Sequence, residues 1–153
     1  MKIIFLDIDG VLATDESSKL LWHEEFLYPF DATCVSIFNR ILDKTSAEIV
    51  LSSDWRIPFQ DLNLLDRLFK HNGINRSPIA VTADFGKNRS KEISSYIQKH
   101  SSKITSILIL DDMDLKIRPK NFIKCSIEYG LNQPGIEEKA IAILNSDQNN
   151  LQT

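Results

Sequence analysis

The sequence predicts an α/β fold in which helices sandwich a doubly wound, parallel β-sheet. Short apolar segments of strand length alternate with segments of helical periodicity along the chain. The apolar segments are continuous, as expected for strands that are buried on both faces of a parallel sheet. With 153 residues, of which 42% are hydrophobic and 25% charged, the chain is long enough for one domain with its own core. Alternating strands and helices imply right-handed crossovers between parallel strands.

The expected elements follow one another in regular order. The first strand, residues 2–7, is too short and too continuously apolar for a surface helix. Gly73 is well placed to end the second helix. The other expected strands are residues 47–51, 79–82, 104–110 and 122–127, and the expected helices are residues 33–44, 58–72, 88–100 and 134–145.

We expect one domain, residues 1–145, with a flap at about residues 13–30 and a polar tail, residues 146–153, that frays or leads into further sequence. No apolar run approaches the ~20 residues of a membrane span. Asp7 and Asp9 interrupt the apolar start too early for a signal peptide. The two cysteines have neither a disulfide framework nor metal-ligand spacing, which is typical of a reducing, cytoplasmic compartment. Export without a cleavable signal stays open.

The charges are distributed unevenly along the chain. The net charge of -3 argues against wholesale nucleic-acid binding. Residues 1–86 hold 8 basic and 13 acidic side chains, whereas residues 87–124 hold 9 basic and 4 acidic ones. Such a basic excess is usually a solvated face, and it would steer anions only if it lay near a functional site.

Polar side chains follow three of the expected strands, and in open α/β sheets ligands bind beyond the carboxyl ends of strands. Four carboxylates gathered at one edge would repel each other and raise each other's pKa values, so a divalent cation is expected among them. A set of oxygen ligands suits Mg²⁺, which also bridges to phosphate. The residues are Asp7 and Asp9 after the first strand, Ser52, Ser53 and Asp54 after the second, and Asp111 and Asp112 after the fourth.

Three segments carry a family resemblance. Asp7-Ile8-Asp9-Gly10-Val11-Leu12, Val50-Leu51-Ser52 and Leu108-Ile109-Leu110-Asp111-Asp112 resemble motifs I, II and IV of the haloacid dehalogenase-like (HAD) superfamily, over roughly residues 2–145. The segments Leu51-Ser52-Ser53-Asp54-Trp55-Arg56 and Tyr129-Gly130-Leu131 are similar to the small HAD domain found in bacterial "Swiss Army Knife" RNA-repair proteins. The resemblance implies a HAD-like Rossmannoid fold and a phosphatase.

The resemblance also implies residue roles. Asp7 would be the nucleophile that forms an aspartyl-phosphate, and Asp9 would be the general acid and then the base. Ser52 would hydrogen-bond a phosphoryl oxygen. Mg²⁺ would be held by the Asp7 side chain, the Asp9 carbonyl and Asp112, with Asp111 as a ligand directly or through water. An Asp at the second position of motif I is the pattern of the phosphatases of the superfamily.

Motif III of the superfamily would contribute a cation that binds the phosphate, and three residues are candidates for it: Lys87, Arg89 and Lys91. Arg89 lies four residues before Ile93, on the expected buried face of the helix. Lys91 points roughly 200° away from Ile93, at ~100° per residue, and Lys87 is expected to precede the helix. We therefore predict that Arg89 binds the phosphate, with Lys87 or Lys91 as the alternatives.

Other polar residues have competing interpretations. Ser52 could merely cap the next segment, with Ser53 as the phosphate ligand, and Asp54 could be a helix cap or hold Arg56. We interpret the two cysteines as core residues and the three histidines as surface residues: Cys34, Cys125, His23, His71 and His100.

The size of the chain leaves no room for a cap domain. The gap between motifs I and II holds only the flap and one helix, and the gap from Trp55 to Lys87 holds one helix and one strand. An open site favours a phosphorylated macromolecule, either a phosphoprotein or a nucleic-acid end. The aromatic flap slightly favours phosphotyrosine-type esters, since its acids would repel a polyanion. The alternatives are a polynucleotide 3′-phosphatase and a non-catalytic phosphate-binding or interaction domain. The acidic and aromatic side chains of the flap are Asp15, Glu16, Glu24, Glu25, Trp22, Phe26, Tyr28 and Phe30.

Overall fold

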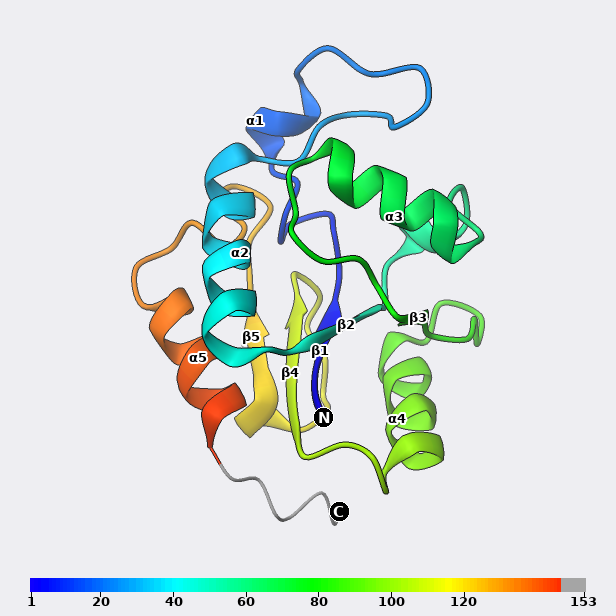
Figure 1. Ribbon diagram of the computed structural model, residues 1–153, viewed down its shortest axis with the longest axis vertical. Helices are drawn as coiled ribbons and strands as arrows, with labels where there is room; N and C mark the ends of the chain where they lie inside the picture. Colours follow the sequence, from blue (N-terminus) through cyan, green and yellow to red (C-terminus); the bar gives the residue numbers. More distant parts are fainter. Residues whose placement is uncertain (147–153) are drawn as a thin grey trace.

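The structure is a computed structural model that describes residues 1–146. Five parallel strands form one sheet in the order β3-β2-β1-β4-β5 (Figure 1). This order reverses direction at β1, so the topological switch point lies between β1 and β4. The sheet confirms the predicted fold class. The strands are β1 (Lys2–Leu6), β2 (Glu48–Leu51), β3 (Ala80–Val81), β4 (Ser106–Asp111) and β5 (Phe122–Lys124).

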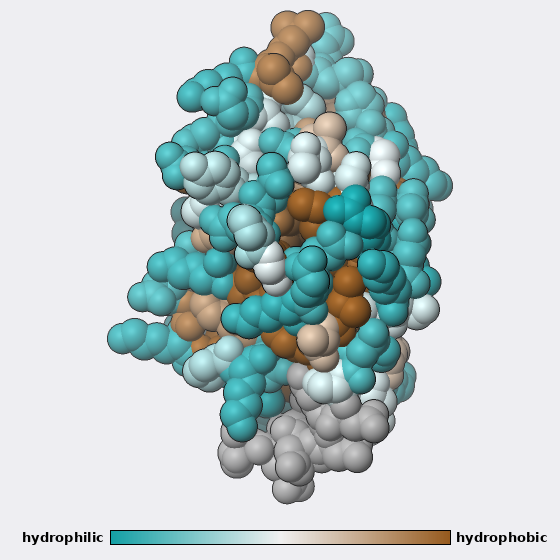
Figure 2. Space-filling view, turned by 90° about the vertical axis from the view of Figure 1, so that its left-hand side faces the viewer, coloured by the Kyte–Doolittle hydropathy of each residue, from teal (hydrophilic) through white to brown (hydrophobic). Residues whose placement is uncertain are grey.

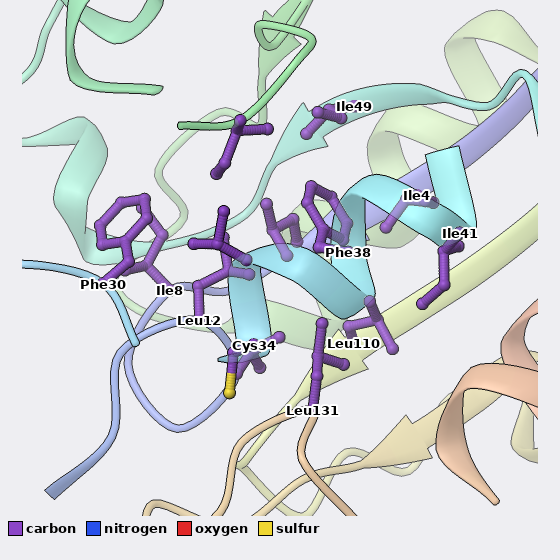
Figure 3. Packing of buried hydrophobic residues seen from close by; sticks show 14 of the residues in the cluster. Ile4, Ile8, Leu12, Phe30, Cys34, Phe38, Ile41, Ile49, Leu110 and Leu131 are labelled. Atoms are coloured by element: carbon purple, nitrogen blue, oxygen red, sulfur yellow. The ribbon is translucent and has the colours of Figure 1, made fainter. Parts of the chain in front are cut away.

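Side chains alternate between the two faces of the sheet, as the pleat of a strand requires. In β1, Ile4 and Leu6 belong to the core cluster that includes α2 (Ala32–Thr45), α3 (Leu62–His71) and α5 (Ile136–Asn145). The odd-numbered residues of β1 face the other way, against α4 (Arg89–His100), which covers the opposite face with its isoleucines. Figure 3 shows the first cluster, in which Ile8, Leu12, Phe30, Phe38 and Leu131 converge from segments far apart in the sequence.

Capping side chains mark the starts of α2 and α3. Asp31 caps α2 by accepting hydrogen bonds from the Thr33 and Cys34 amides. Asp61 caps α3 through the Leu64 amide, so this helix begins at Leu62, four residues later than the apolar pattern predicted. Two short 3₁₀ helices, η1 (Asp54–Arg56) and η2 (Pro119–Asn121), were not predicted. β3 and β5 are also shorter than expected, although the Thr82 and Cys125 amides beyond them still donate to the Leu51 and Asp111 carbonyls.

The flap, residues 13–30, has no core of its own. It holds one short helix, α1 (Asp15–Ser18), capped by Thr14. Its buried rings, Phe26 and Phe30, join the main core cluster. No separate cap domain is present among residues 1–146, as predicted.

The flap also carries exposed apolar side chains. Leu20, Leu21 and Trp22 are 57%, 94% and 59% exposed. Figure 2 shows an apolar projection at the top of the molecule, the end at which the flap lies in Figure 1. Within the described part of the chain, no helix is both long and apolar enough to cross a membrane. The predicted tail lies outside the described residues except for Ser146.

Candidate active site

The register of the sheet aligns the first residues beyond its strands. Leu6 of β1 pairs with Leu51 of β2 and with Leu110 of β4. The next residues, Asp7, Ser52 and Asp111, therefore form a row at the carboxyl edge. Since Ile3 and Phe5 face α4, Asp7 and Asp111 face the same side. The first residue of α4 is Arg89, which is how the fold brings a cation to this row.

Asp7 is buried and held in place. Its amide donates to the Leu110 carbonyl (3.0 Å), and its Oδ1 accepts from the Ile8 amide (2.8 Å). Burial and the neighbouring Asp111 carboxylate raise the pKa of Asp7 well above its ordinary value. A fixed, poorly solvated carboxylate is suited to act as a nucleophile.

Arg89 contacts the carboxylates of both central strands. Its Nη1 lies 2.6 Å from Asp111 Oδ2 and 3.6 Å from Asp7 Oδ2. Burial would lower the pKa of this guanidinium, but the carboxylates of Asp7 and Asp111 outweigh that effect and raise it. Lys87 and Lys91 are both exposed, and the Lys91 ammonium lies over the Phe85 ring, 5.2 Å from its centroid. Of the three candidate cations, Arg89 is the one in contact with the acidic row.

Three carboxylates form a group that could hold a metal ion. Asp7, Asp111 and Asp112 place oxygen atoms within 4.8 Å of one another. Burial raises the pKa of Asp111, and the Arg89 guanidinium opposes this rise. Gly10 has φ +78°, and a Cβ there would collide with the carboxylate of Asp112. The missing side chain leaves space for Asp112, and this all-oxygen set fits Mg²⁺.

The carboxylate of Asp9 points to the flap instead of joining this group. The Tyr28 hydroxyl donates to its Oδ1 (2.5 Å), and the Trp55 indole N–H donates to its Oδ2 (3.0 Å). Burial and the bond to Asp9 raise the pKa of Tyr28. Sequence reasoning treated Tyr28 only as a ring near the entrance and did not single out Trp55. The Tyr28 contact depends on how the flap folds back, and the Trp55 contact depends on how the chain turns into η1 after β2. No local sequence pattern encodes either arrangement.

Two buried hydroxyls at the carboxyl edge of the sheet lack hydrogen bonds in the described structure. Ser52 Oγ and Thr82 Oγ1 have no partner, although both side chains are buried. Ser53 Oγ accepts from the Trp55 amide (3.2 Å) and so caps η1. Of the two serine hydroxyls, that of Ser52 is therefore the one without a partner in the described structure. Because Leu51 pairs with Val81, Thr82 lies next to Ser52. The strand predicted for residues 79–82 included Thr82, so this residue was not among the polar residues expected to follow strands.

A buried ion pair ties η1 to α4. Arg56 Nη2 lies 3.0 Å from Glu92 Oε1, with side chains 7% and 0% exposed. The interpretation that Asp54 holds Arg56 is therefore wrong. Arg56 pairs with Glu92, and the Asp54 carboxylate lies 3.8 Å from Arg89. Glu92 also lies 3.8 Å from Arg89 through its other oxygen. The pair thus fixes the start of α4, where Arg89 enters the site.

The cysteines are core residues, as predicted. Cys34 and Cys125 are buried and free, and burial raises their pKa values to about 11 and about 12. Of the histidines, His23 and His71 are exposed as predicted, whereas His100 is half-buried against Tyr96, with ring centroids 4.1 Å apart.

A known protein-family model covers most of the chain. Residues 3–136 match the family model described as the HAD domain in Swiss Army Knife RNA repair proteins. No curated protein and no solved structure matches the chain.

Proposed function

Since the chain belongs to the family of HAD domains in Swiss Army Knife RNA repair proteins, we propose that it is a Mg²⁺-dependent phosphatase that uses an aspartyl-phosphate intermediate. The observation that carries this proposal is the contact of one buried guanidinium, Arg89, with the carboxylates at the ends of both central strands. Such a cation can hold a phosphoryl group against Asp7 and balance its negative charge.

In the first step, an Asp7 carboxylate oxygen attacks phosphorus, and the bond to the leaving oxygen breaks. Asp9, as the carboxylic acid, gives its proton to that oxygen. In the second step, the Asp9 carboxylate takes a proton from water, the water oxygen attacks phosphorus, and the bond to Asp7 breaks. Tyr28 and Trp55 orient Asp9 for both transfers through their hydrogen bonds.

The phosphoryl oxygens would be held by groups that the fold leaves ready for them. Arg89 supplies guanidinium N–H donors, and Ser52 supplies a hydroxyl that has no other partner in the described structure. Asp7, Asp111 and Asp112 would hold Mg²⁺, with the Asp9 carbonyl as a further ligand. When bound, Mg²⁺ supplies charge neutralisation at the phosphoryl oxygens.

The substrate we propose is a polynucleotide that ends in a 3′-phosphate. The RNA-repair family supports this choice, and it gives no support to a preference for phosphoprotein. Phosphotyrosine-type esters remain the second candidate because Trp22 and Tyr28 stand together at the entrance, with ring centroids 5.1 Å apart, and Tyr28 contacts Asp9. A non-catalytic phosphate-binding domain is the third.

Phosphate release from p-nitrophenyl phosphate tests the chemistry. We expect release that requires Mg²⁺, stops in excess EDTA and falls at least ~10³-fold in Asp7→Asn, while Asp43→Asn, an exposed change on α2, serves as the matched control. Activity that survives Asp7→Asn or EDTA would overturn the mechanism. No turnover of any ester, with phosphate still bound, would favour the non-catalytic domain. A panel of 3′-phosphorylated oligonucleotides, phosphotyrosine peptides and phosphoserine peptides ranks the substrates.

A further inference from the structure

A groove of about 430 Å³ lies between the edge strand β3 and helix α4. It is separate from the acidic row but shares a wall with it, since Glu92 lines the groove and lies one helical turn from Arg89. Its volume is within the range of sites that take small ligands or parts of larger ones. The lining residues are Ala80, Val81, Ala83, Phe85, Glu92, Ser95, Tyr96, Lys99 and His100.

Aromatic rings line the groove along the length of α4. Phe85 lies in the loop before α4 and is 38% exposed. Tyr96 and His100 are stacked on each other, with an angle of 24° between their ring planes. Rings arranged in this way offer π-faces to nucleic-acid bases, which stack on aromatic side chains irrespective of base identity.

The charges around the groove are suited to a polyanion. Lys99 lines it, Lys91 lies over the Phe85 ring, and Lys87 precedes the helix. Asp84 is the exposed acid in the same loop, but it accepts hydrogen bonds from two amides and lies 3.9 Å from Arg56. The flap, by contrast, carries four acids and lies at the other end of the molecule from most of α4 (Figure 1). A polyanion therefore meets less repulsion along α4 than across the flap.

Both carboxylate oxygens of Glu92 face cations where this residue lines the groove. Its Oε1 accepts from the Phe85 amide (3.1 Å) and pairs with Arg56. Its Oε2 is buried, makes no hydrogen bond within the described residues and lies 3.8 Å from Arg89 Nε. Glu92 therefore connects the wall of the groove to the cation of the acidic row.

We propose that this groove binds the single-stranded nucleotides that precede the phosphorylated end, a role that rests on the proposed function. The bases stack on Phe85 and on the Tyr96–His100 pair, and Lys91 and Lys99 bind the backbone phosphates. The terminal phosphate then reaches Arg89 from the α4 side. This route avoids the acidic flap, and it explains why the basic excess of residues 87–124 begins next to the site.

Binding can be measured without turnover. A fluorescent hexanucleotide with a 3′-hydroxyl cannot be hydrolysed, so its affinity for the full chain follows from anisotropy. We expect Phe85→Ala to weaken binding about 10-fold, the loss of one base stack. Lys91→Glu with Lys99→Glu should weaken it further and reduce the salt dependence by about 0.7 per lysine on a log–log scale. Lys139→Glu, an exposed change on α5, is the matched control.

Kinetics separates this proposal from the chemistry. For 3′-phosphorylated oligonucleotides, kcat/KM should rise at least ~10-fold from a mononucleotide to a hexamer, the gain expected from one base stack. The ratio of kcat/KM for the hexamer to that for p-nitrophenyl phosphate should fall about 10-fold in the groove variants and stay constant in Lys139→Glu.

The outcomes are distinguishable. The groove proposal is wrong, and the proposed phosphatase is unaffected, if the protein hydrolyses p-nitrophenyl phosphate but kcat/KM does not rise from the mononucleotide to the hexamer. The same conclusion follows if the groove variants bind the hexamer as tightly as the wild type. If the groove variants bind the hexamer more weakly but no ester is hydrolysed, the groove proposal is supported and the proposed phosphatase activity is wrong. Tighter groove-dependent binding of a phosphotyrosine peptide than of the hexamer also overturns the nucleic-acid assignment.

Discussion

The environment of Asp7 is unfavourable to the ionised form that a nucleophile requires. Its pKa is raised by burial and by Asp111. The folded protein therefore binds this proton more tightly than the unfolded chain does. Above the raised pKa, the ionised carboxylate costs folding free energy, and this cost disappears as the pH falls through the raised pKa toward 3.8.

This predicts that Asp7→Asn, while inactive, has a higher free energy of unfolding than the wild type at pH 7 without metal. The difference should shrink as the pH is lowered to about 4, near the ordinary pKa of an aspartate. Urea denaturation in EDTA measures both values, with Asp43→Asn as the exposed control. A loss of stability at pH 7 in Asp7→Asn would show that the carboxylate is stabilised by its surroundings after all.

Gly10 is required for two independent reasons that can be separated by experiment. Its φ of +78° disfavours a side chain, and a Cβ would also collide with Asp112. Gly73 has φ +81°, but a Cβ there would meet no atom within 4 Å, so this position shares only the first constraint.

We expect Gly10→Ala and Gly73→Ala each to lose about 1–2 kcal/mol of stability from backbone strain. Only Gly10→Ala should also lose Mg²⁺ affinity, by at least ~10-fold, because it displaces Asp112. Isothermal titration with Mg²⁺ measures this difference. Equal Mg²⁺ affinities in the two variants would show that Asp112 does not contribute to the metal site.

At the scale of elements, the flap connects the substrate entrance to Asp9. Tyr28 is the link, since its ring contacts Trp22 and its hydroxyl holds the carboxylate. Tyr28→Phe should lower kcat about 10-fold with little change in KM, less than the ~10²–10⁴-fold expected for loss of the general acid itself in Asp9→Asn. Tyr129→Phe, on an exposed tyrosine, is the control. Unchanged kcat in Tyr28→Phe would mean that the flap does not position Asp9.

The position of α4 depends on the pair between Arg56 and Glu92. Because both side chains are buried, Arg56→Leu leaves an uncompensated charge and should cost about 3–5 kcal/mol. Arg40→Leu breaks a pair of similar length with Glu137 on the surface, where solvent screens the charges, so its effect should be small. Denaturant unfolding of the two variants compares them. Similar losses would contradict a supporting role for the buried pair.

The parts of the site that follow from strand ends were predictable from the sequence. A continuous apolar strand followed by Asp7, or by Asp111 and Asp112, places carboxylates at the carboxyl edge regardless of loop details. Helical spacing from Ile93 likewise predicted that Arg89, and not its lysine neighbours, lies on the buried face of α4, as the structure shows. Tyr28, Trp55 and Thr82 were missed, as was the Arg56–Glu92 pair, because each contact depends on how a loop or a short strand folds in three dimensions.

At the scale of the whole molecule, the strand order fixes where the site lies, and the charge distribution along the chain determines which charges surround it. The order of strands places Asp7 and Asp111 at the switch point between β1 and β4. The acids of the first 86 residues include Asp7 of the metal group and the four acids of the flap, while the basic residues that follow begin with Lys87, just before α4. Within residues 1–146 the site has no separate cap domain, and it is flanked by an acidic flap and a basic helix.

The central claim is that Asp7 becomes covalently phosphorylated. Rapid acid quenching with a ³²P-labelled phosphomonoester, followed by peptide mapping, tests it most directly. The prediction is a hydroxylamine-sensitive label on the peptide that contains Asp7, dependent on Mg²⁺ and absent in Asp7→Asn. Turnover with no label on Asp7, or an equal label in Asp7→Asn, would contradict the claim.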